Sequence, residues 1–273
     1  MRIYAVVNSV EYRHAVSGIL LPGFCPNSNR MNFHVDRAFF SLEKRKLLRL
    51  LELFLILAIA VAPSLFSSIS IFLTGYEYEA IIDPRSALLL WGRKIITNLA
   101  AIASVIYVLF RQGRKLSHIG FYFSKTDFPN SILLTVFAYL AIGLSWVVIY
   151  YIYYLATGHI LSEPITKNIE FLKSGITAWS LLAMIINPFY EEIVVRAYTM
   201  SEIKYLTKNN ILAIIFSVAL QASCHLYQGN ISVLLLAPIF LVYSFYYSKT
   251  QRIMPIILSH MYLDFIALIC HSY

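Results

Sequence analysis

The sequence predicts an all-α bundle of helices that crosses a membrane about seven times. Three observations carry this prediction: 59% of the 273 residues are hydrophobic, only 13% are charged, and the mean hydropathy is +0.68. Soluble globular domains carry about 25% charged residues, so a water-soluble fold of this size could not hide so much apolar surface. The chain has neither a convincing strand pattern nor an internal repeat.

Seven apolar stretches supply the predicted spans. The first, residues 53–73, has no charged residue and is long enough for a hydrocarbon core of about 30 Å, and Pro63 is expected to kink it. The number of spans is expected to be about six to eight, because the boundaries are the weakest part of such a prediction. The remaining stretches are, in order, 95–110, 131–156, 176–200, 211–228, 231–248 and 253–270.

Residues 1–49 are expected to form a flexible basic arm before a bundle of residues 50–273. This arm has two prolines, Pro22 and Pro26, and its charges increase toward Arg49. It lacks the short apolar stretch, closed by small residues, that a cleaved signal peptide has after its first charges. Three cysteines without CxxC spacing support neither a disulfide framework nor a zinc knuckle.

Lysine and arginine are unevenly shared between the two sides of the predicted bundle. The side with few basic residues shows clearly only Arg85, Lys167 and Lys173, and Arg93 and Lys94, at the edge of the second predicted span, are ambiguous. Because cytoplasmic loops retain basic residues, we expect an integral protein of a bacterial cytoplasmic membrane, with a cytoplasmic N-terminus. The net charge of +8 then reflects orientation and contact with membrane lipid, and nucleic-acid binding is disfavoured. The basic side collects Arg30, Arg37, Lys44, Arg45, Lys46, Arg49, Arg111, Arg114, Lys115, Lys125, Lys204, Lys208, Lys249 and Arg252.

Charged residues inside the predicted spans carry the functional signal. Glu191, Glu192 and Arg196 all lie in the stretch 176–200, and each charge costs on the order of 3 kcal/mol to insert. Glu192 and Arg196 are i,i+4 neighbours, and we favour a structural ion pair for them. Glu191 points about 100° away on a helix and stays available for another partner.

Two further spans carry polar residues that can meet Glu191. If the spans 176–200 and 211–228 form an antiparallel hairpin turning near Lys208, then His225 lies at the height of Glu191. His260 and Asp264 are i,i+4 neighbours in the last span, where the carboxylate could orient the imidazole. A lone intramembrane histidine is more often a hydrogen-bonding residue than a catalyst, so the convergence of all four residues is the stronger signal.

At these residues the sequence resembles the CAAX prenyl endopeptidase and lysostaphin-resistance-protein-A-like family, also called CPBP or ABI proteases. The resemblance covers roughly residues 85–270, with a core at about 170–270. Its motifs occur in order: EExxxR from Glu191 to Arg196, a histidine at His225 followed by Leu-Tyr-Gln-Gly, and HxxxN/D from His260 to Asp264. Two departures are Gln221, where the family's FxxxH has Phe, and Asp264, where the best-studied members have Asn.

The resemblance implies an intramembrane endopeptidase that hydrolyses a peptide bond of a membrane-associated protein or peptide. Glu191, helped by His225, would activate water, and His260 would stabilise the oxyanion. An ionised Asp264 cannot donate a hydrogen bond, so we expect it to hold His260 in its donor form. We expect Gln221, one turn before His225, to hydrogen-bond that ring.

Other functions remain open at this point. The favoured mechanism needs no cofactor, and zinc is the alternative, although the chain lacks HExxH. The same buried charges could serve a non-catalytic scaffold, a bacteriocin self-immunity protein or, less well, an ion-coupled transporter, for which inverted repeats are lacking. The positive-inside orientation places Glu191 about 8 Å from the cytoplasmic boundary, and this predicts a cavity that faces the cytoplasm.

Overall fold

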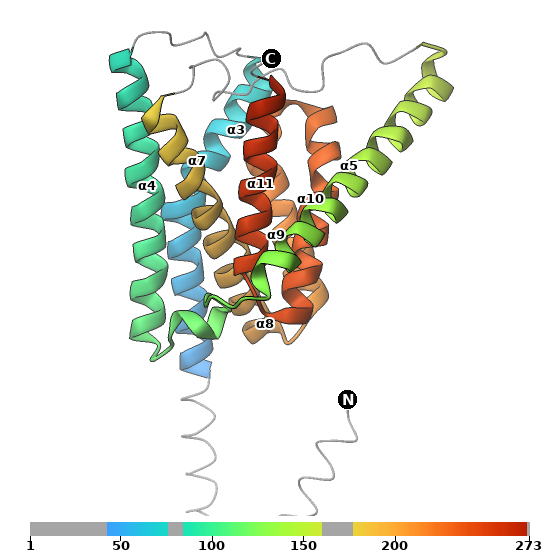
Figure 1. Ribbon diagram of the computed structural model, residues 1–273. Coiled ribbons are helices and arrows are strands. Elements are labelled where there is room, and N and C mark those ends of the chain that lie inside the picture. The colour runs from blue at the N-terminus through green and yellow to red at the C-terminus, as the bar shows by residue number, and fades with distance from the viewer. Residues whose placement is uncertain (1–42, 76–83, 160–176, 272–273) are drawn as a thin grey trace, which may run out of the picture. The chain divides into compact units, whose positions relative to one another are not determined.

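The protein is a bundle of apolar helices (Figure 1). The computed structural model describes residues 43–75, 84–159 and 177–271, and these ranges contain helices and connections but no strand. The all-α class is therefore confirmed. The helical elements are a first helix Glu43–Thr74, which contains the π segment η1 Leu57–Val61 and α3 Ala62–Thr74, then α4 Pro84–Arg111, η2 Leu116–Ile119, α5 Asp127–Thr157, α7 Ala178–Glu191, η3 Glu192–Tyr198, α8 Thr199–Thr207, α9 Asn210–Cys224, η4 Leu226–Gln228, α10 Asn230–Thr250 and α11 Met254–His271.

Each predicted span corresponds to a helix, but the helices differ in length. Five of those described are long and apolar enough to cross a membrane: Glu43–Thr74, Leu88–Arg111, Asp127–Thr157, Ala178–Thr207 and Asn230–Thr250. The other two, Asn210–Cys224 and Met254–Cys270, are apolar but shorter. The protein is therefore a multi-pass integral membrane protein with five long apolar helices and two shorter ones among those described.

The first helix begins earlier than the sequence predicted. Residues from Glu43 onward are helical, whereas the arm was expected to extend to residue 49. Lys44, Arg45 and Lys46 are good helix formers, so a run of charges ends the hydrophobic pattern without ending the helix. Residues 1–42 of the predicted arm lie outside the described residues, as do Lys167 and Lys173 and the side chain of Arg85.

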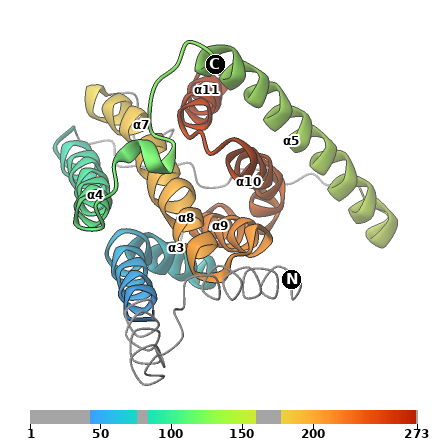
Figure 2. The same cartoon turned by 90° about the horizontal axis from the view of Figure 1, so that it is seen from below.

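The continuous helix formed by α7, η3 and α8 lies in the middle of the bundle (Figure 2). Half of its most apolar 18-residue stretch is buried, a larger share than in the other four long helices, and every residue of η3 is buried. By contrast, α5 leans away from the other helices toward its C-terminal end (Figure 1), and its buried residues all lie between Asp127 and Ala138. The most protected environment in the bundle therefore surrounds the segment that carries Glu191, Glu192 and Arg196.

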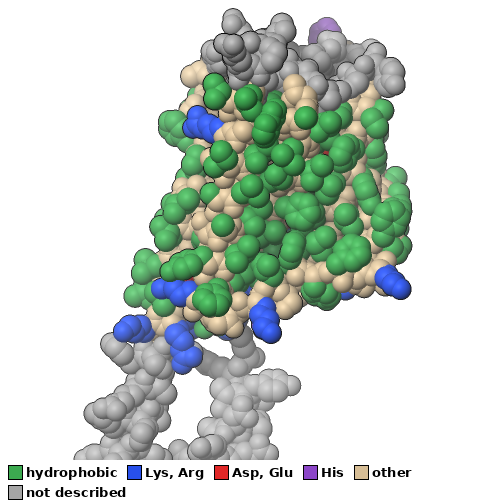
Figure 3. Space-filling view, turned by 60° about the vertical axis from the view of Figure 1, so that its left-hand side comes forward, with side chains coloured by type: hydrophobic (Ala, Val, Ile, Leu, Met, Phe, Trp, Pro, Cys, Tyr) green, Lys and Arg blue, Asp and Glu red, His purple; other side chains and the backbone are tan. Residues whose placement is uncertain are grey.

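Hydrophobic side chains cover the wall of the bundle, whereas lysines and arginines gather near one end (Figure 3). We call this end, where α4 and α10 end, the basic end. Its described basic residues include Arg49, Arg111, Arg114, Lys115, Lys204, Lys208, Lys249 and Arg252.

Gly120 fixes how two connections meet at the basic end. It has φ +77°, and a Cβ atom here would lie 2.0 Å from the carbonyl oxygen of Gln251. Only glycine accepts both the backbone angle and this close approach. The Gly120 carbonyl accepts a hydrogen bond from the Ile253 amide at 3.2 Å, which sets the start of α11 and thus the height of His260.

Candidate active site

A π segment carries the EExxxR motif. Glu191 is the last residue of α7, and Glu192 begins η3, where the amide of Thr199 bonds to the carbonyl of Val194 five residues earlier. Pro188, inside α7, lacks an amide hydrogen and so weakens the regular ladder just before this segment. Such π segments are frequent at functional sites, because the extra residue per turn changes the direction in which neighbouring side chains point.

Amide groups hold both carboxylate oxygens of Glu191. Asn187, one turn earlier in α7, donates to Oε1 at 2.7 Å, and Gln221 of α9 donates to Oε2 at 2.9 Å. Asn187 is itself fixed by Asn98 of α4, whose amide donates to Asn187 Oδ1 at 3.2 Å. Among the described residues, no lysine or arginine lies within ion-pair distance of Glu191.

Glu192 has two partners rather than one. It forms the expected i,i+4 ion pair with Arg196, and the side chains of both residues are 0% exposed. Its other oxygen, Oε1, lies 2.8 Å from Nδ1 of His260, which is 68 residues away in the chain. Glu192 therefore links Arg196 to the predicted catalytic histidine, in addition to the structural pairing that the sequence favoured.

The sequence predicted that Asp264 holds the ring of His260, and this prediction is wrong. Nε2 of His260 lies 3.7 Å from Oδ1 of Asp264, which is beyond hydrogen-bond distance, whereas Nδ1 is bonded to Glu192. An ionised carboxylate only accepts, so Nδ1 of His260 carries the proton in that bond. The i,i+4 spacing brings Asp264 close, but Glu192 fixes the ring.

His225 ends α9 with its ring held on three sides. Nδ1 lies 2.8 Å from the backbone carbonyl of Gln221, so Nδ1 donates, and in the neutral ring Nε2 is the nitrogen that can accept a proton. The ring packs against Phe240 at 5.1 Å and Tyr227 at 6.2 Å between centroids. The amide of Tyr227 donates to the buried hydroxyl of Ser68 at 3.0 Å, which ties this turn to α3.

The side chain of Gln221 does not bond to His225 as predicted. Its Oε1 accepts from Arg196, and its Nε2 donates to Glu191, so only its backbone carbonyl serves the histidine. Arg196 also lies over the ring of Tyr243, with 5.3 Å between its guanidinium carbon and the ring centroid. One buried network therefore runs from Asn98 through Glu191, Gln221, Arg196 and Glu192 to His260.

These residues border one pocket of about 190 Å³ inside the bundle. All four residues predicted to be catalytic, Glu191, His225, His260 and Asp264, line it. The sequence assigned no role to the rest of the lining, although Tyr227 and Gln228 belong to the motif that follows His225. These residues are Trp91, Lys94, Ala183, Met184, Asn187, Tyr227, Gln228, Ala267 and Leu268. Lys94, which lies 5.7 Å from the ring centroid of Trp91, had a signal in the sequence as a charge near the start of an apolar stretch.

The pocket lies away from the basic end. Glu191 is about 24 Å along the helix from the end of α8 at Thr207, and Lys94 is about 25 Å from the end of α4 at Arg111. Leu268 lies one turn beyond Asp264 in the same direction. The pocket therefore lies nearer the end opposite the basic end, whereas the sequence placed Glu191 near the boundary on the basic side.

Zinc would need several histidine, cysteine or carboxylate side chains that converge on one point. Among the residues that the structure describes, no group of three or more His, Cys, Asp or Glu side chains could hold a metal ion. Structural and catalytic zinc sites use at least three such ligands converging on one point. The described side chains therefore supply no such group of ligands, and no step of the mechanism below passes through a metal.

The fold and the pocket define a multi-pass membrane protein with a buried polar site made by helices that are distant in sequence. Residues 173–266 match the family model described as Type II CAAX prenyl endopeptidase Rce1-like. The matched segment runs from α7 into α11 and contains all four predicted catalytic residues, so the family resemblance that the motifs indicated is confirmed. Searches of curated proteins and of solved structures gave no match.

Proposed function

We propose that this protein is an intramembrane endopeptidase that hydrolyses a peptide bond of a membrane-associated protein or peptide. One observation carries the proposal: Glu191, His225, His260 and Asp264 come from three segments of the chain and line the same pocket. Each ionisable group inside a membrane is costly, and such groups mark functional sites by default. The family match to a prenyl endopeptidase indicates the reaction class.

Glu191 is the proposed general base. A carboxylate has about four lone-pair positions, and the amides of Asn187 and Gln221 use two of them, so two remain for a water molecule. Glu191 takes a proton from this water as its oxygen attacks the peptide carbonyl, and Nε2 of His225 can share or relay that proton. The proton then passes to the leaving amine as the C–N bond breaks.

His260 is the proposed oxyanion stabiliser. Its Nδ1 donates to Oε1 of Glu192 at 2.8 Å, and the proposed role requires a second proton on Nε2. In that form Nε2 donates to the carbonyl oxygen as charge develops on it. Oδ1 of Asp264, 3.7 Å from Nε2, lies beyond hydrogen-bond distance and so leaves Nε2 able to donate to the substrate.

The lining suggests what enters the pocket. Trp91, Ala183, Met184 and Leu268 form apolar wall beside the polar residues. A peptide segment with an apolar side chain next to the scissile bond would bury that side chain here while its carbonyl faces Glu191. Membrane lipid would surround the bundle and deliver such a substrate laterally.

The direct test is cleavage of membrane-anchored peptides by the purified protein in detergent, compared with Glu191→Gln. We expect cleavage by the wild type, unchanged by a chelator, and a loss of about 10²-fold or more in the variant. Equal activity of the two proteins would refute the proposed role of Glu191. A scaffold or immunity protein would instead show no cleavage and an unchanged phenotype of Glu191→Gln in cells.

The proposed orientation places the N-terminus and the basic end in the cytoplasm of a bacterial cell, so the pocket lies in the outer half of the membrane. Ala267→Cys lies at the pocket, and Lys249→Cys is its matched control at the basic end. With Cys25, Cys224 and Cys270 replaced, an impermeant thiol reagent added outside intact cells should label Ala267→Cys and spare Lys249→Cys. The reverse pattern would overturn this orientation.

A further inference from the structure

Gln221 is a buried amide that lies between the two charged halves of the site. It is 2% exposed in α9, its Nε2 donates to Oε2 of Glu191 at 2.9 Å, and its Oε1 accepts from Arg196. A carboxylate only accepts hydrogen bonds and a guanidinium only donates them. Only one orientation of the amide therefore satisfies both neighbours, so the contact fixes the side chain without ambiguity.

The same residue also sets His225. The backbone carbonyl of Gln221 accepts the Nδ1 proton of His225 at 2.8 Å, one turn later in the chain. Gln221 thus contacts the proposed base through its side chain and the proposed proton relay through its backbone. Because both contacts come from one residue, the separation between Glu191 and His225 depends on the conformation of Gln221.

The contact also explains how Arg196 acts on Glu191 without pairing with it. Arg196 is 0% exposed and gives its ion pair to Glu192, and the amide of Gln221 lies between its guanidinium and Glu191, hydrogen-bonded to both. Phenylalanine, the residue that the family pattern has here, could neither accept from Arg196 nor donate to Glu191. This chain therefore has a hydrogen-bonded link at a position where the pattern has an aromatic ring.

We infer that Gln221 is the positioning residue of the site, which holds the Glu191 carboxylate in register with His225 while leaving its charge uncompensated by a direct cation. This inference rests on the proposed function of the same site. It concerns the side-chain amide alone, since any residue at position 221 keeps the backbone carbonyl that serves His225.

The test compares Gln221→Met with Ser217→Ala. Methionine keeps the length and volume of glutamine but removes the amide. Ser217, fully buried one turn earlier on α9, donates to the Val195 carbonyl at 3.1 Å, accepts from Ser244 at 3.4 Å and has no hydrogen bond to Glu191 among the described residues. We expect Gln221→Met to lower kcat about tenfold with KM nearly unchanged, because misplacing a catalytic group acts on the chemical step. Ser217→Ala should keep the wild-type kcat.

A second measurement does not depend on cleavage. A membrane-permeant carbodiimide modifies buried carboxyl groups, and mass spectrometry gives the rate at Glu191, with Asp264 in the same pocket as internal standard. We expect Gln221→Met to speed modification of Glu191 about three- to tenfold, the factor that one hydrogen bond is worth, and to leave Asp264 unchanged. If Gln221→Met does not yield folded protein, Gln221→Asn, which is too short to bridge both partners, takes its place.

The outcomes separate the two proposals. Wild-type kcat together with an unchanged Glu191 modification rate in Gln221→Met would overturn the role of Gln221, as would equal losses of kcat in Gln221→Met and Ser217→Ala. If the wild type cleaves no peptide, the proposed function fails, and the modification rate of Glu191 alone then decides whether Gln221 positions this carboxylate.

Discussion

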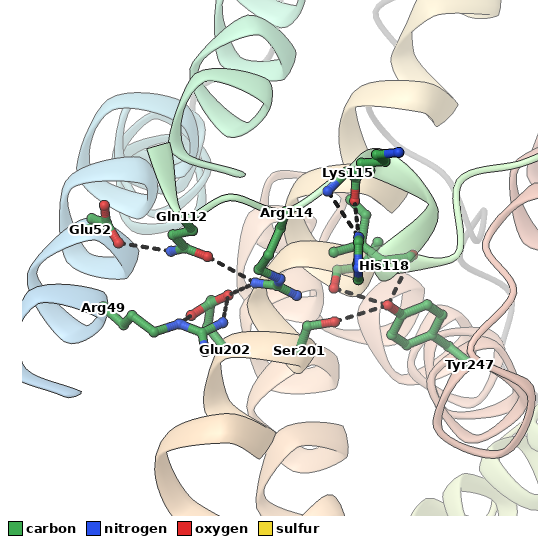
Figure 4. A network of polar contacts seen from close by, with 11 residues as sticks. Arg49, Glu52, Gln112, Arg114, Lys115, His118, Ser201, Glu202 and Tyr247 are labelled. Atoms are coloured by element: carbon green, nitrogen blue, oxygen red, sulfur yellow. Dashed lines mark hydrogen bonds and ion pairs between the residues drawn. The ribbon is translucent and has the colours of Figure 1, made fainter. Parts of the chain in front are cut away.

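Two buried networks hold glutamates in this protein, and they do so with different donors. At the basic end, Glu202 of α8 accepts from Arg49 through both of its oxygens at 2.7 Å and from Arg114 at 2.5 Å (Figure 4). Nearby, Glu52 pairs with Arg111 and accepts from Gln112 at 2.8 Å. Each of these carboxylates therefore has at least one guanidinium against it.

Glu191 in the pocket is held only by amides. Asn187 and Gln221 orient its oxygens, and Arg196 contacts Glu192 and Gln221 instead. A guanidinium neutralises a carboxylate and uses its lone pairs in fixed geometry, whereas a neutral amide orients it without neutralising its charge. The comparison indicates that Glu202 joins helices, while Glu191 is oriented for chemistry.

Replacing Glu191 or Glu202 by glutamine, which removes the charge, tests this difference most strongly. Glu191→Gln should lower kcat about 10²-fold or more without a large change in thermal stability, since its partners are neutral amides. Glu202→Gln should do the opposite, losing about 2–4 kcal/mol of stability because Arg49 and Arg114 lose their counter-ion, while folded protein keeps its kcat. Activity assays and thermal unfolding in detergent measure both quantities. Loss of kcat in Glu202→Gln at full stability would contradict the comparison.

Removing an arginine from each network should give a smaller contrast. Arg196→Met leaves Glu192 buried with only His260 as partner, and we expect a cost of about 3–5 kcal/mol. Arg49→Met should cost less, about 1–2 kcal/mol, because Arg49 is 15% exposed and Arg114 still pairs with Glu202. Thermal unfolding of the two variants side by side gives the order. Equal melting temperatures of the two variants would contradict the expectation that the more deeply buried arginine contributes more to stability.

Within the pocket, the two carboxylates near His260 should differ in effect. Glu192→Gln removes the charge bonded to Nδ1 and should lower kcat of the folded enzyme about tenfold. Asp264→Asn removes a charge 3.7 Å from Nε2 and should change kcat by about threefold or less. Steady-state kinetics with one peptide substrate measures both. A larger loss in Asp264→Asn would restore the pairing that the i,i+4 spacing suggested.

The sequence predicted the helices and their order well, because long apolar stretches and rare intramembrane charges are local signals. It placed Glu191, His225, His260 and Asp264 on three segments, and these four residues line the pocket. It missed the start of the first helix at Glu43, since a basic run resembles a loop when only hydropathy is counted.

Contacts between distant segments could not be predicted from spacing. His260 can reach Asp264 one turn later or Glu192 in another helix, and only the packing of α11 against α7 selects Glu192. The π segment has no sequence signature beyond Pro188, and it turns Glu191 and Glu192 toward different partners. The direction in which the pocket extends also depends on the positions of Trp91 and Lys94, which the motifs do not include.

Hydrolysis in water enriched in ¹⁸O tests the role of Glu191 most directly. The wild-type protein, incubated with a membrane-anchored peptide, should release a fragment whose new carboxylate carries one ¹⁸O atom, as mass spectrometry would detect. Glu191→Gln, purified to the same stability, should release almost none, because no group then takes the proton from the attacking water. Equal ¹⁸O incorporation by both proteins, or cleavage without ¹⁸O in the product, would contradict a water-activating role of Glu191.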